Sequence, residues 1–312
     1  MATFTEKERA CTCTFMNGGP YWHLYTNGKE TSLLFKENQD FTFGVNVLAQ
    51  TVLTFPSVRI IAFTLMDNHV HILASGEREN LAECFAFFRK RIFRGLDIHQ
   101  SSGFVLQIKE IADLSSMRNH IVYIHRNGYV ADKGHTPYSY PWGTGPYYFG
   151  PNLPILRTYK DTTTFERREM FRGRIPDIPK EWKMAGGCIA PPSFCSIVFG
   201  MAMFRDAHHY YFFLNKNVEE YQSMAAELDD YEFLTDSEAY TGILAILKAD
   251  YNGTAMKDLT KAQKFDLARK LRHDFRSSNG QIRRVLGLSQ YEVDSLFPLS
   301  AKSEKSDAQK FC

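Results

Sequence analysis

Several features that would assign a protein to a class at once are missing from this sequence. No stretch approaches about 18 uninterrupted apolar residues, the length that a membrane-spanning helix requires. The first residues, Met1 to Arg9, contain no apolar core of a signal peptide. We therefore expect a chain that does not cross a membrane and that is located in the cytoplasm.

Cysteine is also scarce. The 312 residues include six cysteines, and no two of them have C-x-x-C spacing. Cys11 and Cys13 are too close together for a zinc knuckle. In a cytoplasmic chain such cysteines are usually free thiols rather than a disulfide framework. No P-loop sequence occurs either, so nothing indicates a reaction driven by nucleotide hydrolysis.

The balance of charge is nearly even, but the basic residues are clustered. Lys and Arg number 37 and Asp and Glu 35, which gives a formal net charge of +2. Basic residues mixed with aromatic ones are typical of single-stranded nucleic acid binding, although any one cluster could equally be a solvated helix face. The clusters lie at residues 88–94, 167–174 and 261–284. The candidates for phosphate contacts in the first cluster are Arg89, Lys90, Arg91 and Arg94.

Apolar residues recur with strand and helix periodicity in alternation along the first half of the chain. This interleaving predicts a sheet packed against one or two layers of helices. The stretch from His135 to Phe149 is too rich in Pro and Gly for a regular element and too aromatic for a solvated linker, so we expect an ordered loop packed on this domain. The expected strands are residues 20–26, 59–65, 68–74 and 104–111, and the expected helices are 41–53, 79–97 and 113–128.

A change of composition near Pro151 predicts a domain boundary. We expect a first domain at residues 1–150, a helical connecting region at 151–256 and a DNA-binding segment at 257–300. Within the last segment, two short helical patterns flank a Gly-Leu-Ser turn, and the second begins near Ser289. This arrangement resembles a helix-turn-helix, although an ordinary helical hairpin has the same pattern. The candidate DNA contacts here are Gln281, Arg283, Arg284 and Gln290.

Two histidines stand one residue apart in the apolar run from Leu65 to Leu73. Side chains alternate along a strand, so His69 and His71 are expected on the same face. Two neutral imidazoles side by side form half of a divalent metal site. The alternative is a pair of strand-edge histidines that bond to carbonyl groups. Asp67 could accept a hydrogen bond from the N–H group of one of these imidazoles, or it could serve as a turn residue.

Asn119, Tyr123 and Asn127 are spaced four apart and should share one face of the helix expected after residue 113. A tyrosine within a helix is more often part of the core than of a site. His125 would lie about 200° around the helix from Tyr123, and we do not expect it in the same site.

Three segments together resemble the HUH single-strand endonucleases, in particular the one-tyrosine transposases of the insertion-sequence-200-like and REP-associated groups. They are residues 65–73, Tyr123 to Gly128 and Tyr140 to Gly143, and the resemblance covers roughly residues 20–149. It implies an α+β core with an antiparallel sheet of the ferredoxin or RRM type, followed here by a mostly helical C-terminal region. It also implies that His69 and His71 bind a metal, with Asn127 as a further ligand.

The same resemblance implies that Tyr123 is a nucleophile that cleaves and rejoins single-stranded or hairpin DNA through a 5′-phosphotyrosine. It implies Mg²⁺ or Mn²⁺ as the cofactor, and a cation beside the phenol would favour its ionised form. Members of these groups occur as homodimers that exchange the tyrosine helix and as monomers. Many continue with Asn-Pro where this chain has Asn127-Gly128, a departure that concerns the local geometry more than the activity.

Two other functions compete with this one. The chain could be a catalytically silent DNA-binding protein that acts through its C-terminal helices. It could also be another metal phosphoesterase, such as a histidine-triad hydrolase. The latter class would need a third alternating histidine, and that position is Leu73.

Overall fold

The structure is a computed structural model that divides into two compact units, Met1–Asp230 and Tyr231–Cys312. Each unit is described by itself. The boundary that composition suggests near residue 150 falls inside the first unit, because the chain that follows it packs back onto the core. The residues described are 3–28, 31, 33–99, 103–131, 136–150, 157–216, 218–228, 236–273, 275, 277 and 279–297.

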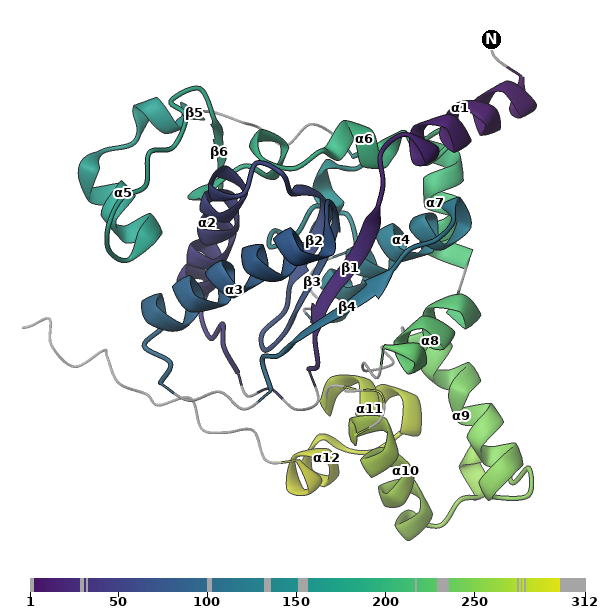
Figure 1. Cartoon of the computed structure of the whole chain (residues 1–312). Coiled ribbons are helices and arrows are strands. Elements are labelled where there is room, and N and C mark those ends of the chain that lie inside the picture. Colours follow the sequence, from purple (N-terminus) through teal and green to yellow (C-terminus); the bar gives the residue numbers. More distant parts are fainter. Residues whose placement is uncertain are drawn as a thin grey trace, which may run out of the picture. The chain divides into compact units, whose positions relative to one another are not determined.

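A four-stranded antiparallel sheet forms the centre of the first unit (Figure 1). Its strands lie in the order β2-β3-β1-β4, and two crossover helices connect them in the sequence βαββαβ. This order is the ferredoxin-like arrangement, so the expected α+β fold class is confirmed. The elements are β1 (Tyr21–Thr26), α2 (Asn38–Thr54), β2 (Arg59–Leu65), β3 (Val70–Ser75), α3 (Arg78–Gly95) and β4 (Leu106–Glu110).

Helices cover both faces of this sheet. Thr64 and Leu65 are neighbours on β2, so their side chains point to opposite faces. Leu65 packs against α2, because a Cβ on Gly44 of that helix would lie 2.9 Å from its Cδ1 atom. Thr64 instead donates a hydrogen bond of 2.6 Å to the carbonyl of Ile124 on α4 (Leu114–Ala131). The face of the sheet that carries the histidines is therefore the face covered by α4.

Helix α4 is longer than the sequence suggests. A helix stop was expected near Gly128, but the helix continues to Ala131. Gly128 is needed for close packing instead, because a Cβ there would lie 2.6 Å from Cδ1 of Tyr140. The hydroxyl of Tyr140 in turn donates to the carbonyl of Leu65, 2.8 Å away, which anchors this contact to β2.

The outer edge of β2 is covered by later parts of the chain. Thr64 forms an isolated bridge with Gly143, and the amide of Leu65 donates to the carbonyl of Trp142 at 2.9 Å. The amide of Ser196 donates to the carbonyl of Ile60 at 2.8 Å. The described part of the aromatic stretch, residues 136–149, is thus an ordered segment packed on the sheet, as its composition predicts.

The remainder of the first unit is only partly helical. A small antiparallel sheet contains β5 (Arg157–Thr158), β6 (Lys183–Ala185) and β7 (Cys188–Ile189). It packs on α2, where Oδ1 of Asn46 accepts the amide of Ile189 at 2.8 Å. The helices are α5 (Thr164–Phe171), α6 (Ile197–Met201), α7 (Ala207–Lys216) and α8 (Val218–Glu227). Short 3-10 turns lie at η1 (Gly145–Tyr147), η2 (Tyr159–Asp161) and η3 (Pro191–Ser193).

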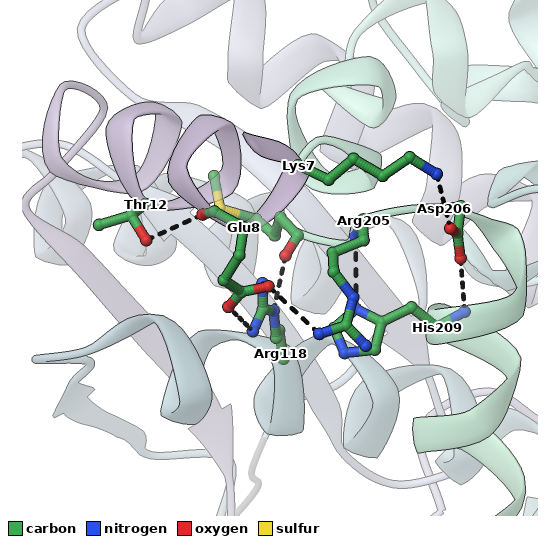
Figure 2. A network of polar contacts seen from close by, with 8 residues as sticks. Lys7, Glu8, Thr12, Arg118, Arg205, Asp206 and His209 are labelled. Atoms are coloured by element: carbon green, nitrogen blue, oxygen red, sulfur yellow. Dashed lines mark hydrogen bonds and ion pairs between the residues drawn. The ribbon is translucent and has the colours of Figure 1, made fainter. Parts of the chain in front are cut away.

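An N-terminal helix, α1 (Phe4–Met16), was not expected from the sequence. The hydroxyl of Thr3 caps its first turn. Both carboxylate oxygens of Glu8 accept hydrogen bonds from the buried guanidinium of Arg118 on α4, at 2.8 and 3.1 Å. Figure 2 shows this ion pair together with Arg205, which also reaches Glu8. The charged cluster fixes α1 to the helix that carries Tyr123.

The second unit is helical in its described part. Its elements are α9 (Asp236–Asp250), η4 (Met256–Asp258), α10 (Lys261–His273), α11 (Asn279–Leu286) and α12 (Gln290–Leu296). Residues from all four helices, among them Ile243, Leu267 and Ile282, share one apolar core. Gly287 adopts a left-handed φ of 63° between α11 and α12, and Ser289 caps α12. The expected short helix, turn and second helix are therefore present.

Candidate active site

The two predicted metal ligands lie side by side at the start of β3. His69 is the last residue before this strand, and His71 is the second residue within it. The centroids of their rings are 5.0 Å apart and the ring planes are almost perpendicular, at 88°. Both side chains are fully buried, so the pair belongs to the interior of the first unit.

Asn68 fixes the orientation of His69. The side-chain amide of Asn68 donates to the carbonyls of Gly28 and Thr31, at 2.7 and 2.9 Å. Its Oδ1 atom is therefore the acceptor that faces Nδ1 of His69, 2.7 Å away. A proton on Nδ1 makes Nε2 the nitrogen with which this imidazole can bind a metal. Asp67 lies in the bend before β3, and its carbonyl accepts the amides of Leu34 and Phe35.

Tyr123 extends from α4 to the histidine pair. Its ring centroid is 5.4 Å from that of His71, with the two planes at 88°. Asn127 lies one turn further along the same helix and is fully buried. The two histidines thus lie at the start of β3, and the expected nucleophile and Asn127 lie on α4, the helix that covers this face of the sheet.

Two further histidines belong to this cluster, and neither was predicted from the sequence. Nε2 of His23, on β1, lies 3.1 Å from Nδ1 of His71. The ring of His120, on α4, lies edge-on to that of His23 at 5.2 Å. His23 and Tyr25 are two residues apart along β1, as His69 and His71 are along the chain, so their side chains share one face of the strand. This spacing is the signal in the sequence from which His23 could have been predicted.

Burial favours the neutral form of His23 and of His120. It is the main cause that lowers the pKa of His23 well below its usual value, and the nearby His120, His71 and Lys109 add to the effect. Burial also lowers the pKa of His120 to about 4. Neutral imidazole is the form that binds metal ions.

A divalent metal is compatible with this set of donors. Two imidazoles and the amide of Asn127 offer mixed nitrogen and oxygen ligands, which suit Mn²⁺ better than Mg²⁺. Within the described ranges there is no group of three or more His, Cys, Asp or Glu residues that could hold a metal ion. A metal here would therefore depend on the amide and on groups from solvent or substrate.

The cluster is closed to solvent. The side chains of His23, His69, His71, Tyr123 and Asn127 are each at most 1% exposed. A Cβ on Gly28 would lie 2.7 Å from Nδ1 of His69, so the chain at Gly28 passes directly over that ring. A cavity of about 300 Å³ is found instead beside α2 and α5, with Gln39, Arg157, Phe165 and Arg172 in its wall.

His125 is excluded from the cluster, as its angular position on the helix predicts. Its Nδ1 atom pairs with the hydroxyl of Tyr210 and its Nε2 atom with that of Thr144, both at 2.9 Å. Burial lowers the pKa of His125 to about 3. The residue therefore supports the packing behind α4.

The basic residues predicted on α3 fall into two environments. Lys90 and Arg94 are exposed. Arg91 is half-buried, and its Nε atom donates to the side chain of Gln50 at 3.2 Å. The guanidinium of Arg89 stacks over the ring of Phe93 at 4.9 Å. Lys90 and Arg94 are thus the two of this set whose side chains extend into solvent.

The predicted DNA contacts of the second unit also differ in exposure. Arg283 and Arg284 are exposed on α11. Gln281 is only 2% exposed, so its side chain belongs to the interior. The side-chain amide of Gln290 donates to the carboxylate of Asp294, one turn along α12. The two arginines are therefore the best placed of these four for a ligand.

Comparisons with known proteins identify no family for the chain. No family model matches it, and no curated protein matches it in sequence. One similar solved structure is a REP-associated tyrosine transposase bound to a REP hairpin. The match covers 54% of this chain and 94% of the other, with 13% identity and a TM-score of 0.35. Overlap at this level supports no function by itself, so the proposal below is based on the residues of the site.

The length and apolar character of the helices can be compared with the expectation that the chain does not cross a membrane. In the part of the chain that the structure describes, no helix combines the length and the apolar character needed to span a bilayer.

Proposed function

We propose that the protein is an endonuclease and strand transferase for single-stranded DNA, with Tyr123 as its nucleophile. The observation that carries this proposal is the position of the Tyr123 ring, 5.4 Å from His71 and beside the paired imidazoles. A phenol at a pair of imidazoles is a suitable arrangement for metal-assisted attack on a phosphodiester.

In the proposed reaction, Oη of Tyr123 loses its proton and attacks the phosphorus of the scissile phosphodiester. A new bond joins Oη to phosphorus, and the bond from phosphorus to the 3′ oxygen breaks. The leaving oxygen takes up a proton and becomes a free 3′-hydroxyl, while the 5′ phosphate stays on the tyrosine. Attack by another 3′-hydroxyl reverses these steps and joins two strands, so no high-energy cofactor is required.

Three residues would hold the divalent cation: His69, His71 and Asn127. When bound, Mg²⁺ or Mn²⁺ neutralises a non-bridging phosphate oxygen and favours the ionised phenol. The role of the chain is to present the two imidazoles at the start of β3 and to hold the phenol next to them. Asn68 contributes by keeping the proton of His69 on Nδ1.

Access to this site requires movement, because the cluster is buried. The chain at Gly28 covers His69, and Asn68 holds it there through the carbonyls of Gly28 and Thr31. A DNA strand can reach the phenol only if the residues that cover the cluster are displaced. Cleavage is thus expected to depend on binding of the strand, which must supply the free energy for this displacement.

The test is covalent capture of labelled DNA. The protein is incubated with Mn²⁺ and a labelled single strand that contains a hairpin, and adducts are separated under denaturing conditions. We expect an adduct with the native chain and none with Tyr123→Phe. The matched control is Tyr210→Phe, which removes another buried hydroxyl outside the cluster and should retain the adduct. Adduct formation by Tyr123→Phe would contradict the assignment of the nucleophile.

A second candidate is a DNA-binding protein that does not cleave. The closed state of the cluster and the exposed Arg283 and Arg284 on α11 favour it. Under this function the native chain would retain the labelled strand on a native gel, with or without Mn²⁺, and would form no adduct. The same assay therefore separates the two candidates.

A further inference from the structure

We propose that His23 is a positioning residue that keeps the proton of His71 on Nδ1 by accepting it at Nε2. The two residues belong to a row of three buried imidazoles, His120, His23 and His71. This inference rests on the proposed function, because it concerns the nitrogen with which His71 would bind the metal. Nothing in the resemblance to known families assigns this role to His23 or to His120.

The row begins at His120, whose tautomer is fixed by the backbone. Nδ1 of His120 lies 2.7 Å from the carbonyl oxygen of Ser116. A carbonyl can only accept, so Nδ1 of the neutral imidazole must carry the proton. Nε2 of His120 is then an acceptor, and it is buried without a hydrogen-bond partner among the residues that the structure describes.

His23 is the next imidazole in the row. Its ring lies edge-on to that of His120, at 5.2 Å and 86°. Nδ1 of His23 is likewise buried and has no hydrogen-bond partner in the described part of the chain. No hydrogen bond joins the two rings, so the position of the His23 proton depends on its other nitrogen, Nε2, which contacts His71.

The contact with His23 occupies Nδ1 of His71, so Nε2 is the nitrogen that His71 can offer to the proposed metal. A neutral His71 that binds through Nε2 carries its proton on Nδ1, and Nε2 of His23 is then the acceptor. The donor and acceptor atoms are 3.1 Å apart. Nε2 of His71 is then unprotonated, which is the state required of a metal ligand.

His71 thus has the same tautomer as His69, but a different hydrogen-bond acceptor fixes it. For His69 the acceptor is the side-chain oxygen of Asn68, and for His71 it is the imidazole of His23. Outer hydrogen bonds of this kind set the orientation and basicity of metal-binding histidines.

The direct test is the tautomeric state of the three rings, observed by two-bond ¹H–¹⁵N correlation spectra of the ¹⁵N-labelled protein in the absence of metal. We expect His120, His23 and His71 all to carry the proton on Nδ1. In His23→Gln, whose side-chain oxygen can still accept, His71 should keep this tautomer, whereas in His23→Phe it should not. A native protein in which His71 carries the proton on Nε2 overturns the proposal.

Binding of Mn²⁺ alone, followed by electron paramagnetic resonance, provides a second measurement. His23→Phe should weaken binding by about 10- to 100-fold, the usual cost of losing an outer partner of a metal ligand. His23→Gln should stay close to the native affinity. The matched control is His125→Phe, which removes a buried imidazole of α4 outside the row and should leave the affinity unchanged. Native affinity in His23→Phe contradicts the proposal.

These measurements are independent of DNA cleavage. If the expected tautomers and Mn²⁺ affinities are found but no DNA adduct forms, the proposed function fails and the positioning role of His23 stands. If the adduct forms while His23→Phe binds Mn²⁺ as the native chain does, the reverse holds.

Discussion

His23 and His71 join two neighbouring strands through their side chains, with Nε2 of one 3.1 Å from Nδ1 of the other. The two residues are not directly opposite in the sheet, since His71 pairs with Tyr25 and His23 with Leu73. Their contact is therefore diagonal, between positions on the same face. It makes the geometry of a predicted metal ligand on β3 depend on β1.

Asn68→Ala is expected to destabilise the first unit and to weaken metal binding. The substitution removes the donors to the carbonyls of Gly28 and Thr31 and the acceptor for His69. The loss of buried hydrogen bonds should lower the free energy of unfolding by about 1–3 kcal/mol. Urea denaturation measures this change, and the affinity for Mn²⁺ is measured in parallel. Asn17→Ala, which removes an exposed amide from the end of α1, should leave both quantities near their native values.

Gly128→Ala is expected to destabilise the protein although alanine favours helices. The gain in helix propensity is about 1 kcal/mol, and forcing a methyl group against a packed ring costs about 1–3 kcal/mol. The ring is that of Tyr140, 2.6 Å from the added Cβ. In a Tyr140→Ala background the same substitution should become neutral or stabilising. Equal destabilisation in both backgrounds, measured by thermal unfolding, would contradict this explanation.

Glu8→Gln is expected to cost more stability than Lys7→Ala, although both residues form ion pairs on α1. The side chain of Arg118 is only 8% exposed, so loss of its carboxylate partner leaves a buried charge and should cost about 1–3 kcal/mol. Lys7 and Asp206 are 39% and 45% exposed, and such a pair contributes about 0–1 kcal/mol. Chemical denaturation of the two variants measures the difference, and equal losses would show that burial of Arg118 is unimportant.

The stability of the folded protein should decrease as the pH falls from about 6.5 to 4, in part because of His209. Burial, with the nearby Arg205 and Arg118, lowers the pKa of His209 to about 4 in the folded protein, whereas an unfolded histidine has a pKa near 6.5. In this range the unfolded chain therefore binds a proton that the folded chain does not. His209→Asn should show a smaller loss of unfolding free energy between these pH values. An unchanged slope would exclude His209 as a cause.

Substitution of Arg283 and Arg284 by alanine should weaken retention of DNA without destabilising the second unit. Both side chains are exposed. For each arginine that binds a phosphate, its removal should reduce the slope of log affinity against log salt concentration by about 0.7–0.9. Gln281→Ala should have the opposite profile, with lower stability and an unchanged slope, because Gln281 is buried. Fluorescence anisotropy over a range of salt concentrations measures the slope.

Much of the fold could be predicted from local patterns. Strand β2 coincides with its expected residues 59–65, because a continuous β-branched and aromatic run of this length favours a buried strand. Helix α1 was missed, since only Cys11 and Phe15 of its residues are buried and the apolar repeat is correspondingly weak. The end of α4 was misplaced because a glycine that stops a helix and a glycine that admits a neighbouring ring look the same in sequence.

The candidate site was predictable only where its residues are close in sequence. His69 and His71 stand out because they alternate within one expected strand, and Tyr123 and Asn127 because they are four apart in one expected helix. His23 joins the cluster through the pairing of β1 with β3, which connects residues 48 positions apart. The burial of Gln281 depends on how four helices of the second unit pack, and helical periodicity alone did not reveal it.

The two edges of the central sheet differ in their capacity to accept another strand. At β2 the backbone already bonds to Gly143, Trp142 and Ser196. Strand β4 forms the opposite end of the sheet. It carries Lys109 and Glu110 among its five residues, and charged side chains on an end strand discourage pairing with a second chain. The fold thus covers the margin at β2 and places charge on the strand at the other margin.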